Sequence, residues 1–156
     1  MSNRTPANAI AELLVPAAID VDLKAASKED VLRCLCRRLW EAGLVRDEAA
    51  VLAAVLAREQ AGSTGCGSGV AIPHARVTEV SRIVLAAGLM RSGIEFGSID
   101  GQPAKIFFLV IGPQHSPEAY LRLLSQIAQL VREKEFRDAL LSCPDAAAVI
   151  ELLRAV

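Results

Sequence analysis

Two apolar runs, at residues 83–90 and 105–111, constrain the fold of this chain more than any other feature of its sequence. Both are nearly continuous in apolar residues, whereas a strand with one face in water alternates between apolar and polar side chains. Asp100-Gly101 lies between the two runs and marks a turn. We therefore expect two strands that are buried on both faces, which requires helices on each side of the sheet.

The rest of the chain can supply those helices. Helical periodicity predicts a helix that begins after Ser27 and ends at Gly43, and another that begins after Asp47 and runs to about residue 60. Ser116-Pro117 opens a third helix, since an N-cap is followed there by Pro at the first helical position. The remaining expected segments are a loose lead-in at 1–27 with a short alternating stretch at 19–23, and two shorter helices near 136–141 and 146–153.

These elements predict an α/β fold, with one three-layer domain over residues 1–156 and a small β-sheet flanked by helices on both faces. Lys and Arg number 17 against 18 acidic residues, and aromatic residues make up only 4%, so we expect no nucleic-acid partner. No apolar run is long enough to span a bilayer and no signal peptide is recognisable, which predicts a cytoplasmic protein without membrane insertion. The four cysteines lack metal-ligand spacing, so we expect no metal site.

The segment at residues 58–76 carries the candidate chemistry. Four glycines within residues 62–69 leave backbone amides uncovered, and successive free amides can form an anion-binding concavity. A short apolar strand and Pro73-His74 follow. Hydroxyl and guanidinium groups that could hold a phosphoryl group lie in or beside this segment. Together with the backbone of the glycines, they predict phosphate binding by Ser63, Thr64, Gly65 and Arg76. Arg58 is predicted to act with His74 as a catalytic residue.

His74 is the candidate nucleophile. Its ordinary pKa of about 6.5 leaves a ring lone pair available at neutral pH, and phosphoryl transfer needs little beyond positioning and neutralised oxygens. The glycines match neither the P-loop nor the dinucleotide-binding spacing, so we expect no cofactor. From spacing alone, the alternative remains a set of ordinary turns followed by a histidine at a strand end.

The string Arg-Glu-x-x-Gly-Ser-Thr-Gly-x-Gly-x-Gly-Val-Ala-Ile-Pro-His at residues 58–74 resembles the active-site signature of the mannitol/fructose-type IIA domains of the bacterial phosphotransferase system, a group that includes the nitrogen-regulatory IIA proteins. The likeness continues at residues 94–103 and 121–128 and covers nearly the whole chain. It implies a mixed sheet, and a phosphocarrier whose His74 is phosphorylated by a small histidine-phosphorylated carrier protein (HPr or NPr). Arg58 matches the phosphate-stabilising arginine of the family. The resemblance is closest to the nitrogen-regulatory branch. It implies that the phosphorylated protein acts mainly in regulation or passes its phosphoryl group to a sugar-permease IIB component.

Two departures from the family pattern leave an alternative open. Ala75 stands where the family usually has glycine, and Tyr120 stands where it commonly has a second histidine that assists onward transfer. Tyr120 could instead donate a hydrogen bond to the phosphoryl group, or be a tyrosine at the edge of the core. The alternative function is a non-transferring regulatory module that only binds partners, and a hydrolase or small-molecule binder is a third hypothesis. His115, the only other histidine, is either a loop residue that reaches His74 or one without a role.

Overall fold

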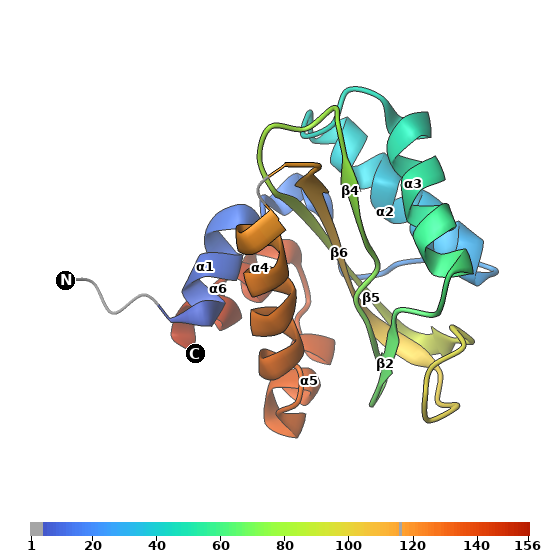
Figure 1. The fold of residues 1–156 in the computed structure, drawn as a ribbon. Coiled ribbons are helices and arrows are strands. Elements are labelled where there is room, and N and C mark those ends of the chain that lie inside the picture. Colours follow the sequence, from blue (N-terminus) through green and yellow to red (C-terminus); the bar gives the residue numbers. More distant parts are fainter. Residues whose placement is uncertain (1–4, 116) are drawn as a thin grey trace.

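The computed structural model describes residues 5–115 and 117–156, and its sheet lies between two layers of helices (Figure 1). One layer contains α2 (Lys28–Glu41) and α3 (Glu48–Gln60). The other contains α1 (Pro6–Leu13), α4 (Pro117–Leu130), α5 (Lys134–Leu141) and α6 (Ala146–Ala155). The predicted three-layer α/β fold is confirmed.

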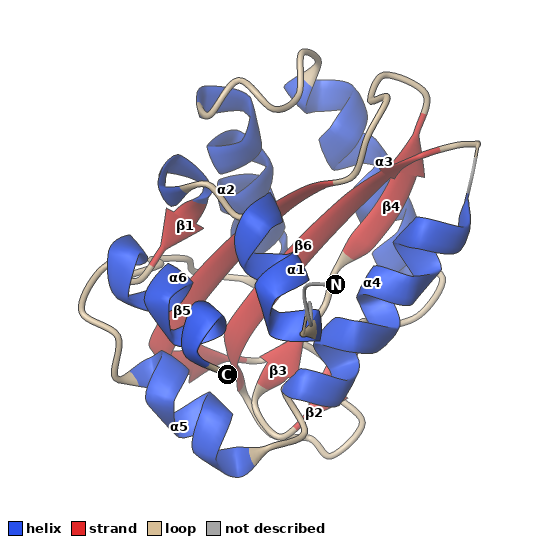
Figure 2. Cartoon of the chain, turned by 90° about the vertical axis from the view of Figure 1, so that its left-hand side faces the viewer, coloured by secondary structure: helices blue, strands red, loops and turns tan. Residues whose placement is uncertain are grey.

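The sheet is mixed, as the family resemblance implies (Figure 2). Its order is β1-β5-β6-β3-β2, and β4 also pairs with β6. The long central strands β5 and β6 are antiparallel, whereas β1 runs parallel to β5 and both β3 and β4 run parallel to β6. The strands are β1 (Ile19–Asp20), β2 (Gly65–Gly67), β3 (Val70–Ala71), β4 (His74–Val77), β5 (Val84–Ile94) and β6 (Ala104–Pro113).

Both faces of strand β6 are buried, which explains why its sequence lacks a polar face. Alternate side chains on a strand point to opposite faces of the sheet, and here each face is covered by its own hydrophobic core. The core shared with α1, α4, α5 and α6 takes Ile106, Phe108 and Val110, and the core shared with α2 and α3 takes Phe107, Leu109 and Ile111. All six are at most 1% exposed, so a polar residue at any of these positions would be buried.

The N-caps read from the sequence determine where two helices begin. The hydroxyl of Ser27 accepts a hydrogen bond from the Asp30 amide at 3.1 Å, and the carboxylate of Asp47 accepts one from the Ala50 amide at 3.0 Å. Each satisfies an amide that lacks an intrahelical partner in the first turn. Ser116, the predicted cap of α4, lies outside the described residues.

Two elements differ from the sequence-based expectation. Part of the predicted loose lead-in is the helix α1, whose N-cap Thr5 accepts a hydrogen bond from the Asn8 amide at 3.2 Å and precedes Pro6. His74 does not end a strand but begins one, β4. Among the helices of the described residues, none has the length and apolar character needed to cross a membrane.

Strands β3 and β4 follow each other along the same edge of β6, separated only by residues 72 and 73. Val70 pairs with Ile106 and His74 with Val110, so the register is unchanged across the gap between the two strands. Pro73 lies in the gap because it has no amide hydrogen to donate, yet its carbonyl accepts a bond from the Val110 amide at 3.0 Å. The Ile72–Pro73 peptide bond is trans. His74 is therefore held directly on the central ladder of the sheet.

Candidate functional site

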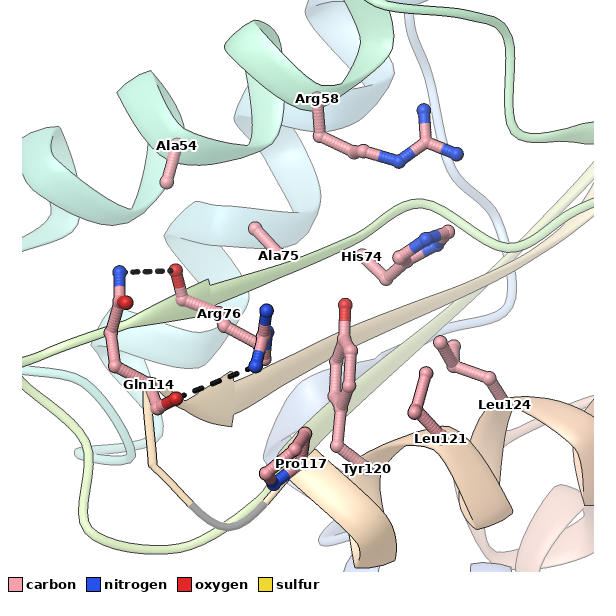
Figure 3. A pocket seen from close by; sticks show the side chains of 10 residues that line it. All are labelled: Ala54, Arg58, His74, Ala75, Arg76, Gln114, Pro117, Tyr120, Leu121 and Leu124. Carbon is pink, nitrogen blue, oxygen red and sulfur yellow. Dashed lines mark hydrogen bonds between the residues drawn. The ribbon is translucent and has the colours of Figure 1, made fainter.

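A cleft of about 570 Å³ lies between α3, β4 and α4 and brings together residues from distant parts of the sequence (Figure 3). His74 and Arg76 come from β4, Arg58 from α3 and Tyr120 from α4. All four are predicted site residues, and they line one cavity. Its other lining residues are Ala54, Ala75, Gln114, Pro117, Leu121 and Leu124.

The imidazole of His74 has one nitrogen committed to the backbone. Nδ1 lies 2.7 Å from the carbonyl oxygen of Ile72, two residues earlier in the chain. A carbonyl oxygen only accepts hydrogen bonds, so Nδ1 carries the proton in this contact. The neutral ring then has its lone pair on Nε2, which is the nitrogen able to attack an electrophile.

Burial favours this neutral form of His74. The side chain is partly buried, and burial lowers its pKa below the ordinary value by penalising the charged ring. The hydrogen bond to Ile72 opposes this shift, the positive charge of Arg58 adds to it, and Glu59 opposes it. Because burial dominates, Nε2 stays unprotonated at neutral pH and somewhat below it.

Two guanidinium groups line the cleft, that of Arg58 from α3 and that of Arg76 from β4 (Figure 3). Nη1 of Arg58 donates to the carbonyl of Gly62 at 2.8 Å, which ties the side chain to the end of its own helix. Nη1 of Arg76 is 3.4 Å from the carbonyl of Gln114, whose side chain lies 3.5 Å from the Arg76 carbonyl. Guanidinium groups bind phosphoryl oxygens through paired N–H donors, so two of them beside one histidine form a site suited to a phosphoryl group.

Tyr120 presents its hydroxyl to the same cleft while its ring belongs to the core (Figure 3). The residue is 5% exposed, and its ring centroid lies 6.1 Å from that of His74. Gly112 makes room for the ring, since a Cβ at that position would lie 2.6 Å from Cδ2 of Tyr120. Burial raises the pKa of Tyr120 to about 12, so the hydroxyl keeps its proton and can donate it.

Ser63, Thr64 and Gly65 do not line the cleft. The Ser63 hydroxyl donates to the carbonyl of Phe96 at 2.7 Å and accepts from the Gly65 amide at 3.0 Å. Thr64 is buried, and both its amide and its hydroxyl donate to the carboxylate of Glu59. The glycine-rich segment at residues 65–71 forms the hairpin β2–β3.

A buried ion pair that the sequence analysis did not identify holds this hairpin in place. Nζ of Lys28 lies 2.6 Å from the carboxylate of Glu59, whose side chain is only 5% exposed. The same ammonium donates to the carbonyl of Phe96 at 3.1 Å and lies 4.5 Å from the centre of its ring. The pair therefore joins the start of α2, the end of α3 and the loop after β5. Nothing in the local pattern indicates it, because its partners are 31 residues or more apart in the sequence.

Apolar side chains at the edge of the cleft were also not predicted. Leu121 is 59% exposed on α4, and Leu124 and Ala54 line the cavity beside it. The sequence contains an indication of them, because these residues lie on the same helices as the predicted site residues Tyr120 and Arg58 and within one turn of them. His115 is exposed and is not among the lining residues. Within residues 5–115 and 117–156, no group of three or more His, Cys, Asp or Glu side chains could hold a metal ion.

The sequence matches a known protein-family model over residues 12–156, and that model is described as "Phosphoenolpyruvate-dependent sugar phosphotransferase system, EIIA 2". The chain is 34% identical over 144 residues to a nitrogen regulatory protein of Bradyrhizobium diazoefficiens, covering 92% of this chain and 94% of that protein. It is 33% identical over 144 residues to the fructose-specific EIIABC component of Bacillus subtilis. That match covers 92% of this chain but only 23% of the longer protein.

Solved structures resemble the fold over nearly the whole chain. The crystal structure of the nitrogen regulatory protein IIA-Ntr from Neisseria meningitidis superposes with a TM-score of 0.86 at 32% identity, covering 93% of this chain and 99% of that one. The IIA mannitol structure from Escherichia coli has a TM-score of 0.76 at 22% identity over 90% of this chain and 98% of that one. The second likeness concerns the fold.

Proposed function

The chain belongs to the EIIA 2 family of the phosphoenolpyruvate-dependent sugar phosphotransferase system, and on that premise we propose that it is a phosphocarrier that accepts a phosphoryl group on Nε2 of His74. The observation that carries this proposal is the contact of Nδ1 with the Ile72 carbonyl. It leaves Nε2 with the lone pair, in a cleft that two guanidinium groups share.

The donor is a small carrier protein phosphorylated on histidine, of the HPr or NPr type. The Nε2 lone pair of His74 attacks the phosphorus as the phosphorus–nitrogen bond of the donor breaks, and the donor's imidazole leaves with that electron pair. The proton on Nδ1 of His74 stays in place, hydrogen-bonded to Ile72. Transfer between two imidazoles needs positioning and charge neutralisation more than proton transfer, and the cleft offers both.

The cleft residues divide these tasks. Arg58 and Arg76 neutralise the phosphoryl oxygens, and Tyr120 donates one further hydrogen bond, for which its raised pKa keeps the proton available. The exposed Leu121 and neighbouring Leu124 form an apolar edge that the carrier protein covers when it docks. We assign Ser63, Thr64 and Gly65 to holding the hairpin rather than to direct phosphate contact, because their polar groups already have partners.

A regulatory outlet fits the chain better than sugar delivery. Tyr120 stands where the family commonly has the histidine that assists onward transfer, so a phosphoryl group on His74 would be held rather than passed on. Phosphorylation then adds nearly two negative charges beside an apolar edge and changes which proteins dock there. The nitrogen regulatory relative, matched over 94% of its length, supports a regulatory role, and we place that role in the cytoplasm. Delivery to a IIB component remains the other outlet, since an IIA mannitol protein of Escherichia coli has been solved in complex with its phosphorylated IIB partner.

A second candidate function is a binding module that takes no phosphoryl group. Ala75 and Tyr120 favour it as departures from the family pattern, yet the backbone of Ala75 pairs with Ile111 and its side chain is buried in the core shared with α2 and α3. The two candidates differ in one observable property, which is whether His74 becomes phosphorylated.

Intact-mass measurement tests this directly. The protein is incubated with phosphoenolpyruvate, enzyme I and the histidine carrier, next to His74→Ala and to His115→Ala as the matched control. We expect an acid-labile phosphoryl adduct in the wild type and in His115→Ala, none in His74→Ala, and slow labelling in Arg58→Ala. Nitrogen-15 NMR of the adduct should place the phosphorus on Nε2. A folded wild type that stays unlabelled by an active carrier would favour the binding module.

A further inference from the structure

A second cleft, of about 500 Å³, lies at the other end of the β2–β3 hairpin from His74. It is lined by Ser68 and Gly69 of that hairpin, by the β5–β6 region and by α5. It shares no lining residue with the His74 cleft. It takes no part in the phosphoryl transfer proposed for His74.

Positive charge is concentrated in this cleft. Lys105, Lys134 and Arg137 line it, and Asp138 is its one acidic lining residue. Lys134 and Asp138 pair with each other at 2.7 Å, and the charges of the lining side chains, three cations less one carboxylate, sum to +2. The whole chain has a formal net charge of −1, so this excess is a property of the cleft and not of a basic protein.

Two of the cations have their positions restricted by the fold. Nη1 of Arg137 donates to the carbonyls of Val131 and Arg132, each at 2.8 Å, which fixes the guanidinium at the turn before α5. The stem of Lys105 packs over Gly93, where a Cβ would lie 3.3 Å from Cγ of the lysine. Binding a ligand to Arg137 therefore costs little conformational entropy, because its guanidinium is already held in place.

The remaining lining groups suit a compact organic anion. Ser68, Ser92 and Gln102 offer neutral hydrogen-bond donors, while Ile106 and Leu141 provide apolar surface. Ser68 is held in a left-handed conformation, with φ of 56°, and its amide donates to the Asp100 carboxylate at 2.8 Å. No aromatic side chain lines the cleft, so nothing there would stack on a nucleobase.

We propose that this cleft is a binding site for a small phosphomonoester, whose dianionic phosphate lies between Lys105 and Arg137 and whose organic part rests against Ile106 and Leu141. The charge of such a ligand, about −2 at neutral pH, matches the local charge of the cleft. This site is independent of phosphoryl transfer on His74.

Backbone-amide NMR of the full chain, titrated with glycerol 3-phosphate, tests the site. We expect saturating shifts at Ser68, Gly69, Ser92 and Lys105, because these residues lie in or beside the cleft. Lys105→Gln keeps most of the stem and removes one charge-assisted bond, which should weaken binding by about tenfold. Lys24→Gln is the matched control, since that side chain is 85% exposed and lies outside the cleft, and it should leave the affinity unchanged.

Inorganic phosphate, glycerol and succinate separate the contributions. Phosphate should bind more weakly than the ester, and glycerol should give no shifts. The proposal is overturned if shifts occur only around His74 and Arg76, if Lys24→Gln weakens binding as much as Lys105→Gln, or if succinate binds as tightly as the ester. None of these outcomes bears on the His74 adduct, which the mass measurement tests separately.

Discussion

Arg91 joins three separate segments of the fold, and replacing it offers a quantitative test of how the C-terminal helices are held on the sheet. From β5, its Nε donates to the carbonyl of Leu141 at 2.7 Å, Nη1 to that of Val21 at 2.6 Å and Nη2 to that of Cys143 at 2.7 Å. Two of these carbonyls lie at the end of α5 and just after it, where the helix leaves its last acceptors unpaired. Arg91→Met keeps an apolar stem and removes all three donors.

The expected loss follows from the number of bonds and their exposure. The side chain is exposed, so each bond is worth the value of a typical protein hydrogen bond, about 1 kcal/mol, rather than the larger value of a buried charged one. Three bonds give a loss of about 3 kcal/mol in the free energy of unfolding, or about 6–12 °C in Tm for a chain of this size. Arg91→Lys keeps the charge but not the planar fork, and should lose about 2 kcal/mol.

Urea unfolding followed by circular dichroism measures these losses. Arg33→Met is the matched control, because Arg33 is exposed and its side chain makes no hydrogen bond or ion pair within residues 5–115 and 117–156. Its free energy of unfolding should stay within about 0.5 kcal/mol of the wild type. If Arg91→Met is no less stable than Arg33→Met, the three bonds contribute nothing to the free energy of unfolding.

Three further predictions concern the site and its support. Lys28→Met leaves the buried carboxylate of Glu59 without its cation, so urea unfolding should show a loss of about 2–4 kcal/mol, and an unchanged stability would contradict the assigned role of the pair. Tyr120→Phe removes a donor to the phosphoryl group and should shift the phosphoryl-exchange equilibrium with the carrier about tenfold toward the carrier, as read from intact mass; no shift would leave Tyr120 a core residue only. Burial lowers the pKa of His74, and above that pKa Nε2 carries no proton. The rate of phosphoryl acceptance should therefore be level between pH 7 and 8 and fall only below pH ~6.5, the ordinary pKa of histidine. A fall that begins above pH 7, or an NMR titration of His74 centred there, would contradict this.

The layers of the fold could be predicted from the sequence because the run of apolar residues in β6 indicates helices on both faces of the sheet. Its side chains alternate between two cores, so residues 106–111 are all apolar, as expected for a strand covered on both faces. The caps at Ser27 and Asp47 were equally local signals. β4 was not predicted as a strand, since residues 74–77 include an exposed arginine and are held as a strand through pairing with β6, some 36 residues away.

The candidate site was predictable only where a residue's role depends on its own neighbourhood. His74, Arg58 and Arg76 lie in or next to one signature segment, and the structure brings them to one cleft with Tyr120. Ser63 and Thr64 have the chemistry of phosphate ligands, but their hydroxyls bond to Phe96 and Glu59 instead. The choice among possible partners depends on how β2 and the loop after β5 approach each other in space, and the local sequence does not contain that information.

The attachment of His74 to β6 also determines how the site fluctuates. β6 is hydrogen-bonded to β5 on one side and to β3 and β4 on the other, so its amides should exchange with solvent only when the whole domain unfolds. His74 lies on that ladder, opposite Val110. Arg58, by contrast, lies in the last turn of a helix and its guanidinium is bonded to the Gly62 carbonyl, so moving this side chain requires fewer bonds to break. Fluctuations short of global unfolding should therefore move the side chain of Arg58 while His74 stays in place. In the free protein, the position of the phosphate-binding guanidinium varies, whereas the position of the nitrogen that bonds to phosphorus does not.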